Sequence, residues 1–393
     1  MKVDIQAFFN QYNDFDIRLR GDARYVDHKC TPDIVCFIAD CILNTSCAIK
    51  PFTIKDIWKT DYFIQNTRVA FHKPYADDES AKNEYNKVLC QPLKLLAYAH
   101  VLNVDETRRT LVFSVNDVNM LEYIASRENC SYNFLSAFFT RVVTDSGIMR
   151  FFIDYESECR TGKIRDAKVH LYSRYNRFIA ANTPTKSKLD TDRMLHKVLN
   201  VFAFTKLIPG SNGKIPDWND LMYNRPNWRD KYKSKIMTRK EAAEQERDEI
   251  NANFYIEYQV SKAIKNVKKQ QGDISEIQDE LANGKATEVH HIFPKSAYPT
   301  IATFYENLIL LTSSQHRQKA HPNGNTQIVN RDYQLVCLMA KSRTIESSIA
   351  KGDNFYRRDY FVNVINIGLN EALDISMSFE AIREFLVNLY IKA

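Results

Sequence analysis

The sequence has little glycine, no cysteine pair at metal-binding spacing and no long apolar run. Ten glycines in 393 residues leave few long flexible loops, and no glycine-rich loop that cradles phosphates occurs, which disfavours an ATP-driven enzyme. None of the eight cysteines forms a Cys-x-x-Cys pair, so we expect free thiols in a reducing compartment rather than a structural zinc knot. No run approaches the roughly 18 apolar residues of a membrane span, and residues 1–10 lack the apolar core of a signal peptide. We therefore expect a cytoplasmic protein that does not associate with a membrane.

What the sequence does contain is the composition of an ordinary folded protein. Hydrophobic residues make up 44% and charged residues 26% of the chain, which is typical of a soluble globular protein. A chain of this length is expected to form two or three domains. We predict a multidomain α+β fold with three regions, at residues 1–147, 148–284 and 285–393.

The first region, residues 1–147, has the pattern of short helices followed by a strand. Thr31-Pro32-Asp33 provides an N-cap, a first-turn proline and a first-turn acid, and apolar residues then recur at helical spacing up to Ile42. A longer helix is expected after Pro92, and residues 110–115 alternate like a strand. This order is compatible with a winged helix-turn-helix that reads DNA, and equally with another small α+β domain.

The middle region, residues 148–284, is expected to be basic and largely helical. Between Arg225 and Lys240 it has seven basic residues and one acid, which gives this window a formal charge of +6, equal to that of the whole chain. Such a window can neutralise nucleic-acid phosphates; the alternative is a solvated linker or helix face. Residues 240–271 lack proline and glycine and predict a long helix. The expected DNA contacts here are Arg225, Arg229, Lys231, Lys233 and Lys235.

The third region opens with a concentration of histidines, four of the nine in the chain, between His290 and His321. Residues 288–292 predict a short strand, and residues 307–312 predict its antiparallel partner. A hydroxyl side chain at the end of the second strand then caps a helix over residues 315–320. We expect strand, loop, strand and helix in this order, followed by strands and helices over residues 355–391.

Neighbouring residues of a strand point to opposite sides, so His290 and His291 are expected to have different tasks. His290 and, from the helix, His316 would hold a divalent cation that neutralises charge on a scissile phosphate. His291 suits a general base because an imidazole titrates near about pH 6.5. Asn307 offers a donor and an acceptor and is expected to tie the loop into place.

The order and local structure of these residues resemble the HNH nucleases, whose core is the ββα-metal motif. The resemblance implies that His291 is the general base that activates water. It implies that His290 and His316 are metal ligands and that Asn307 is mainly structural. Glu288 stands where some members have a further ligand or an acid that orients the base.

His321 departs from the common family pattern, in which a second helix histidine follows the first by four residues. His316 and His321 are five residues apart, which in an α-helix separates them by roughly 140° around the axis. We therefore expect His321 to be a ligand only if the last turn is distorted, and otherwise to contact a phosphate. Lys295 and Arg317, which lie within the motif, are expected to contact DNA.

Two segments at opposite ends of the chain, residues 22–33 and 290–325, are similar to segments of HNH-type type II restriction endonucleases. The resemblance implies an N-terminal part that reads sequence and a C-terminal domain that hydrolyses double-stranded DNA, using Mg²⁺, Mn²⁺ or another divalent ion and leaving 5′-phosphates. One such site cuts one strand, so a homodimer is expected on DNA, with a cognate DNA methyltransferase as a separate protein. The alternatives are another HNH nuclease, such as a homing, toxin or nicking enzyme, and a non-catalytic DNA-binding protein with a structural metal.

Two short triplets, Asp27-His28-Lys29 and Asp166-Ala167-Lys168, match the end of a different nuclease pattern, an acid followed by (Glu/Asp)-x-Lys. Triplets of this kind arise often by chance, so we assign no catalytic site to them. Asp190, Asp192 and Arg193 form a further polar cluster, which the start of a helix explains.

Overall fold

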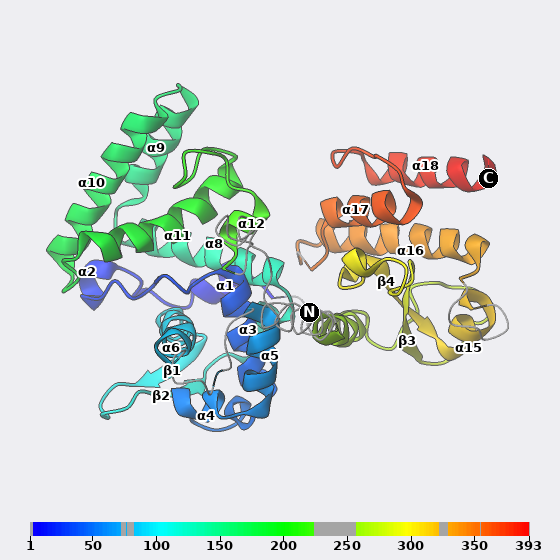
Figure 1. Ribbon diagram of the computed structural model, residues 1–393, viewed down its shortest axis with the longest axis horizontal. Helices are drawn as coiled ribbons and strands as arrows, with labels where there is room; N and C mark the ends of the chain where they lie inside the picture. Colours follow the sequence, from blue (N-terminus) through cyan, green and yellow to red (C-terminus); the bar gives the residue numbers. More distant parts are fainter. Residues whose placement is uncertain are drawn as a thin grey trace, which may run out of the picture. The chain divides into compact units, whose positions relative to one another are not determined.

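The chain forms two compact units, an N-terminal unit over residues 3–251 and a C-terminal unit over residues 252–393 (Figure 1). The described part is mostly helical and has two small antiparallel sheets of two strands each. The expected α+β class therefore holds only coarsely, because helices dominate. The division into three regions at residues 147 and 284 stays a prediction. The computed structural model describes residues 3–71, 76, 82–223, 257–321, 329–353 and 355–392.

The N-terminal unit opens with short helices around a buried one, α3. This helix begins at Pro32, as predicted, and is buried along almost its whole length. The prediction for α6 was wrong, because this helix does not start after Pro92 but contains it. Proline removes one backbone donor from a helix, and the buried Leu89, Leu93 and Leu96 around it offset that loss. The elements are α1 (Ile5–Phe9), α2 (Ile17–Arg20), α3 (Pro32–Leu43), η1 (Ser46–Ala48), α4 (Ile54–Trp58), α5 (Asp61–Phe71) and α6 (Lys82–Tyr98).

A short hairpin follows α6, and Phe52, from earlier in the chain, pairs with its second strand. β1 (Leu102–Asp105) pairs antiparallel with β2 (Val112–Val115), with Val104 opposite Phe113. Phe52 exchanges two backbone hydrogen bonds with Phe113, with N–O distances of 2.8 and 2.7 Å. Their buried rings stack with centroids 6.0 Å apart. The strand predicted over residues 110–115 is thus confirmed as β2. Along the chain, α3 is followed by the paired residue Phe52, then by α4 to α6, and then by the hairpin.

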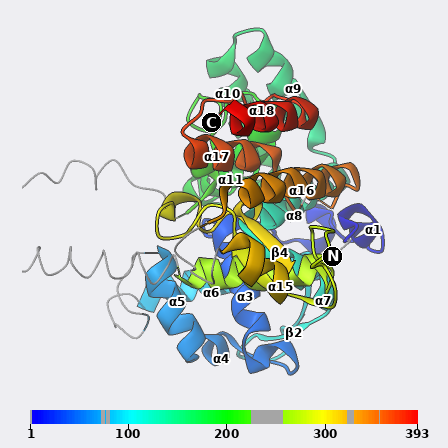
Figure 2. The same ribbon diagram turned by 90° about the vertical axis from the view of Figure 1, so that its right-hand side faces the viewer.

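Longer helices complete the N-terminal unit. α9 and α10 are neighbours (Figure 2), joined by a turn at Gly162, whose φ of 82° suits glycine. α11 packs along α10 (Figure 1). The buried hydroxyls of Tyr25 and Tyr175, 2.6 Å apart, connect the start of the chain to α10. None of the described helices is long and apolar enough to cross a membrane. These helices are α7 (Val118–Ser126), α8 (Glu128–Asp145), α9 (Met149–Arg160), α10 (Ile164–Asn182), α11 (Lys188–Lys206) and α12 (Trp218–Leu221).

The C-terminal unit combines one strand pair with helices. β3 pairs antiparallel with β4, with His290 opposite Ile309, and the chain turns directly from β4 into a short helical segment. The predicted order of strand, loop, strand and helix is therefore confirmed. The long helix predicted to end at Gln271 is present over residues 257–271. The elements are β3 (Ala286–His291), η3 (Pro299–Ile301), η4 (Tyr305–Asn307), β4 (Leu308–Thr312), α15 (Ser313–Gln315), the π-helical turn η5 (His316–Ala320), α16 (Arg331–Ala350), α17 (Arg358–Leu369) and α18 (Phe379–Lys392).

The final helices form the core against which the strand pair packs. α16 contacts both α17 and α18, and all three contribute to one apolar cluster with β4. The strands expected over residues 355–391 are absent from the described residues there, which form α17 and α18 instead. Their buried side chains recur at helical spacing, as with Phe361 and Ile365, so the period favours helix. None of the eight cysteines forms a disulfide, which agrees with the expected thiols.

Candidate metal centre

The end of β3 separates two adjacent histidines onto opposite sides of the strand. His290 lies opposite Ile309 and is 3% exposed, while His291 lies opposite Leu308 and is half-buried. The His290 ring faces the helical turn that follows β4, and the His291 ring faces the loop between the strands, where it meets Ala302. The strand geometry thus gives the two imidazoles different surroundings, as the sequence predicted.

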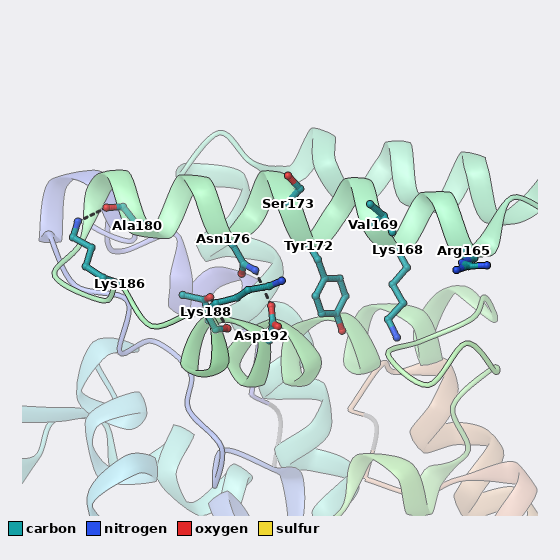
Figure 3. Close-up of a pocket in the computed structure, with 11 residues that line it drawn as sticks. Arg165, Lys168, Val169, Tyr172, Ser173, Asn176, Ala180, Lys186, Lys188 and Asp192 are labelled. Atoms are coloured by element: carbon teal, nitrogen blue, oxygen red, sulfur yellow. Dashed lines mark hydrogen bonds between the residues drawn. The ribbon is translucent and has the colours of Figure 1, made fainter.

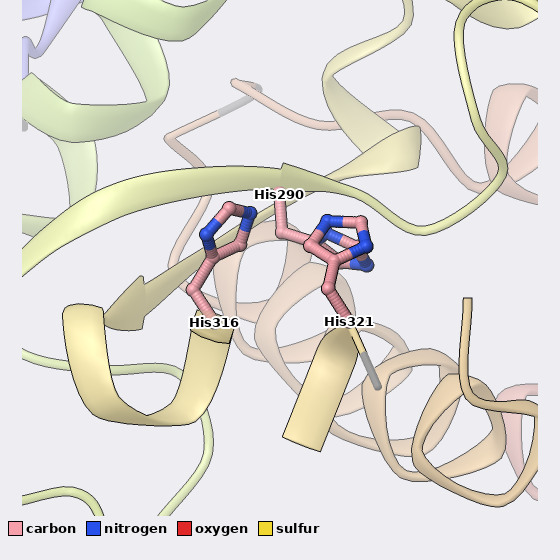
Figure 4. A group of neighbouring side chains, drawn as sticks. All are labelled: His290, His316 and His321. Atoms are coloured by element: carbon pink, nitrogen blue, oxygen red, sulfur yellow. The ribbon is translucent and has the colours of Figure 1, made fainter. Parts of the chain in front are cut away.

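Three imidazoles converge on one point between β3 and the helical turn. Candidate ligand atoms of His290, His316 and His321 all lie within 4.8 Å of one another. Their ring centroids are 4.7 to 5.3 Å apart, and Figure 4 shows the rings gathered in one space. A strand supplies one of these side chains and a single helical turn supplies the other two. We name this group the histidine triad.

A π-helical turn is what brings His321 into the triad. The amide of His321 donates to the carbonyl of His316 over 3.2 Å, a bond that spans five residues instead of the four of an α-helix. Residues five apart in a π-helix lie roughly one turn apart, so both imidazoles point the same way. The 140° separation expected for an α-helix therefore does not apply here. A π-turn is a frequent feature of functional sites because it realigns side chains in this manner.

The start of the turn is fixed by a capping box and a buried glutamine. Thr312 is the N-cap, and its hydroxyl accepts from the amide of Gln315 over 3.2 Å. The Gln315 side chain is fully buried, accepts from the amide of Thr312 over 3.0 Å, and donates to the Ile277 carbonyl and Asp279. The sequence alone does not decide which hydroxyl among residues 312–314 is the N-cap, and it did not lead us to assign a role to Gln315. The Thr-x-x-Gln pattern was the available signal.

Burial disfavours the charged form of two of the three imidazoles, those of His290 and His316. Desolvation, followed by repulsion from the other imidazoles, lowers the pKa of His290 to about 3. Burial also lowers the pKa of His316, and the neighbouring His321 lowers it further. The Nε2 atom of His290 is buried and has no hydrogen-bond partner in the described structure. Such an orphaned polar atom is costly, and a bound metal ion satisfies it, since metals bind neutral imidazole.

The orientation of His291 leaves one ring nitrogen available as a base. Its Nε2 lies 3.0 Å from the carbonyl oxygen of Ala302. A carbonyl only accepts, so Nε2 carries the proton and Nδ1 carries the lone pair. Burial lowers the pKa of His291, partly countered by this bond to Ala302. The role of Ala302 has no side-chain signal in the sequence, because a backbone atom performs it.

Asn307 ties the loop between the strands to the end of β3. Its Oδ1 accepts from the amide of Phe293 over 2.9 Å, and its Nδ2 donates to the carbonyls of Phe293 and Ile301 over 3.0 and 3.3 Å. Its own carbonyl accepts from the amide of Ile292 over 2.9 Å. Asn307 is fully buried, so these bonds hold the backbone that directly follows His291 to the loop segment next to Ala302. The expected loop-fixing role matches this geometry.

The remaining predicted site residues lie around the triad without joining it. Glu288 accepts from Ser313 over 3.3 Å, and its charge partly offsets the lowering of the His316 pKa by burial. Lys295 forms an ion pair with Glu257 at 2.6 Å. Arg317 is exposed on the π-turn. The predicted DNA contacts Arg225, Arg229, Lys231, Lys233 and Lys235 lie outside the described residues.

Comparison with protein-family models, curated proteins and solved structures found no match to this chain.

Proposed function

We propose that the C-terminal unit is a metal-dependent phosphodiesterase of the ββα-metal type that cuts DNA. The observation that carries this proposal is the pairing of two sites on adjacent residues of β3. His290 belongs to a triad of converging imidazoles, and His291, the next residue, presents an unprotonated Nδ1. A cation site next to an oriented base is what hydrolysis of a phosphodiester requires.

The histidine triad fits a divalent ion that is borderline between hard and soft in its ligand preference. Imidazole suits Zn²⁺, Ni²⁺ and similar ions, whereas Mg²⁺ favours carboxylates and water. The donor set therefore favours Zn²⁺ or Ni²⁺ over the Mg²⁺ or Mn²⁺ that the resemblance implies. Three protein ligands are typical of catalytic zinc sites, which keep a position open, while structural sites use four. Among the described residues His290, His316 and His321 supply three, which favours catalysis over a structural metal.

The chain's own residues account for the proton transfer. A bound ion would offset charge on the scissile phosphate. His291 takes a proton from water at Nδ1, and the Ala302 carbonyl stabilises the imidazolium because it already accepts from Nε2. The lowered pKa of His291 keeps the ring unprotonated at neutral pH, ready to act as base. Asn307 holds the backbone of Phe293, two residues after His291.

The N-terminal unit supports DNA recognition. α3, the bridged Phe52, the helices α4 to α6 and the β1–β2 hairpin follow one another in the order of a winged helix. Arg108 and Arg109 are exposed at the hairpin tip, which suits phosphate contact. We propose a sequence-specific endonuclease of the type II restriction class, acting as a homodimer on DNA and leaving 5′-phosphates. A separate cognate methyltransferase would protect the host sites.

Plasmid cleavage tests this proposal. The chain is stripped with a chelator, supplied with Mg²⁺, Mn²⁺, Ni²⁺ or Zn²⁺ in turn, and incubated with supercoiled plasmid, and the ends of the products are sequenced. We expect cutting at one short fixed sequence with at least one ion, and none with chelator. His316→Ala should abolish cutting, whereas His170→Ala, an exposed histidine of α10, should not change it.

Three outcomes separate the proposal from its alternatives. Cleavage without sequence preference would indicate another kind of HNH nuclease. Tight binding of one ion with no cleavage by any of the four would favour a non-catalytic protein with a structural metal. Full cleavage by His316→Ala would refute the role of the triad.

A further inference from the structure

A pocket that shares no residue with the histidine triad lies within the N-terminal unit. It has a volume of about 620 Å³ and is formed by α10, α11 and the loop that connects them (Figure 3). Volumes of this size are typical of small-molecule sites. Lys168 of the acid-x-lysine triplet, to which no role was assigned above, lies in its wall.

The pocket carries more positive than negative charge. Four cations, Arg165, Lys168, Lys186 and Lys188, line it together with one acid, Asp192. The ammonium groups of Lys168 and Lys186 donate to backbone carbonyls. Across the described ranges none of the four cations forms an ion pair with a carboxylate of the chain, and Asp192 pairs with an amide. A surplus of cations without counter-ions favours an anionic ligand.

Two neutral polar atoms of the pocket are buried without partners. These are the hydroxyl oxygen of Tyr172 and Oδ1 of Asn176, neither of which has a hydrogen-bond partner in the described structure. Asn176 is oriented, because its Nδ2 donates to Asp192 over 2.7 Å, so Oδ1 is left as a free acceptor. Figure 3 shows both side chains projecting from α10 toward α11. A buried polar atom without a partner costs about 1–3 kcal/mol, which a ligand with an N–H group would recover.

An aromatic and apolar surface accompanies these polar atoms. The Tyr172 ring lies among the pocket-lining residues with Val169 and Ala180. Burial raises the pKa of Tyr172 above its usual range, so the hydroxyl is neutral and can donate. A simple inorganic anion would use the cations but neither this surface nor the Asn176 acceptor. An uncharged ligand would leave the cations without a counter-ion.

We propose that this pocket binds a nucleotide. The cations bind its phosphate, the base lies against Tyr172, and the edge of the base offers an N–H to Asn176 and an acceptor to the Tyr172 hydroxyl. Two sources share this chemistry, a free nucleotide and a nucleotide unit of a DNA strand. The inference does not depend on the proposed nuclease activity.

Titration calorimetry of the full chain with three probes tests the proposal. The probes are deoxyadenosine 5′-monophosphate, inorganic pyrophosphate and a 12-nucleotide single strand. We expect the mononucleotide to bind at one per chain and at least tenfold more tightly than pyrophosphate. Tyr172→Phe and Asn176→Ala should each weaken nucleotide binding by about tenfold or more and leave pyrophosphate binding unchanged. Lys168→Met should weaken both.

Controls separate binding from folding. Tyr172→Phe removes a hydroxyl that has no partner in the free chain, so circular dichroism and the melting temperature should stay as in wild type. Arg177→Met, on α10 but outside the pocket lining, should leave all three affinities unchanged. Binding of the 12-mer alone, weakened by Tyr172→Phe and Asn176→Ala, would support the proposal with a strand as the source. Pyrophosphate binding as tight as nucleotide binding, no binding of any probe, or unchanged binding by both variants would overturn it.

Discussion

The π-turn between His316 and His321 allows a sharp prediction, because changing its length by one residue alters the alignment of two ligands in a known direction. Deleting the exposed Gln318 leaves the histidines four residues apart. Four residues of an α-helix turn through roughly 400°, so the imidazoles would lie about 40° apart and still face one metal. Inserting one alanine after Gln318 makes the spacing six residues, and the imidazoles then lie about 120° apart.

The expected size of the effect follows from the number of ligands. Structural zinc sites with four ligands bind with about 10–16 kcal/mol, or roughly 2.5–4 kcal/mol for each ligand. Loss of His321 from the triad should therefore weaken Zn²⁺ binding by about 10²- to 10³-fold, at 1.4 kcal/mol per tenfold. We expect this loss in the insertion variant and in His321→Ala. The deletion variant should stay within about tenfold of wild type.

Competition between the protein and a chromophoric chelator measures these affinities, with circular dichroism to confirm folding. The design preserves both flanks of the change, since His316 keeps its place after Gln315, and Lys319 and Ala320 keep theirs before His321. His170→Ala, outside the triad, serves as the control and should bind Zn²⁺ like wild type. An insertion variant that binds as tightly as wild type would refute the alignment argument. So would a folded deletion variant that binds as weakly as His321→Ala.

Three further predictions concern the stability of the C-terminal unit. Asn307→Ala leaves buried groups of Phe293 and Ile301 without partners and should lower the free energy of unfolding by about 3 kcal/mol in urea titrations; an unchanged urea midpoint would contradict this. Gly368→Ala would place a Cβ 2.4 Å from the buried Phe293 ring and should cost about 1–3 kcal/mol, read as a lower melting temperature. In metal-free protein the pKa of His290 is near 3, below its value of 6.5 when unfolded, so the unfolded state binds more protons between these values. Stability should be fully present above pH 6.5 and fall as the pH drops toward 3, by up to about 5 kcal/mol, at 1.36 kcal/mol per pH unit. His290→Gln should flatten that slope in urea titrations at several pH values, and an equal slope would count against the buried neutral ring.

The strand pair and two of the three triad residues, His290 and His316, could be predicted from the sequence because local signals agree there. A continuous apolar, β-prone run predicts β4, Pro294 marks the end of β3, and a hydroxyl at the end of β4 predicts a cap. Side-chain alternation on β3 then separates His290 from His291 without any knowledge of the tertiary fold. These features rest on chain neighbours alone.

Other features depend on tertiary contacts that no local pattern reports. The π-turn has no sequence signature apart from the five-residue spacing of His316 and His321. On α-helical geometry that spacing argued against His321 as a ligand. Proline inside α6 is tolerated because buried leucines surround it. The Ala302 carbonyl that orients His291 is a backbone atom, so any residue at that position could provide it. α17 and α18, where strands were also expected, form because their apolar side chains pack against α16.

Single-turnover cleavage by His291→Ala, with metal content measured on the same samples, tests the central claim most directly. His291 is assigned to proton transfer and not to the metal, so the variant should bind one ion and bind DNA as wild type does. Its cleavage rate should fall by about 10²- to 10⁴-fold, the usual contribution of a general base. Cleavage at the wild-type rate with the metal in place would contradict the assignment of His291 as the base.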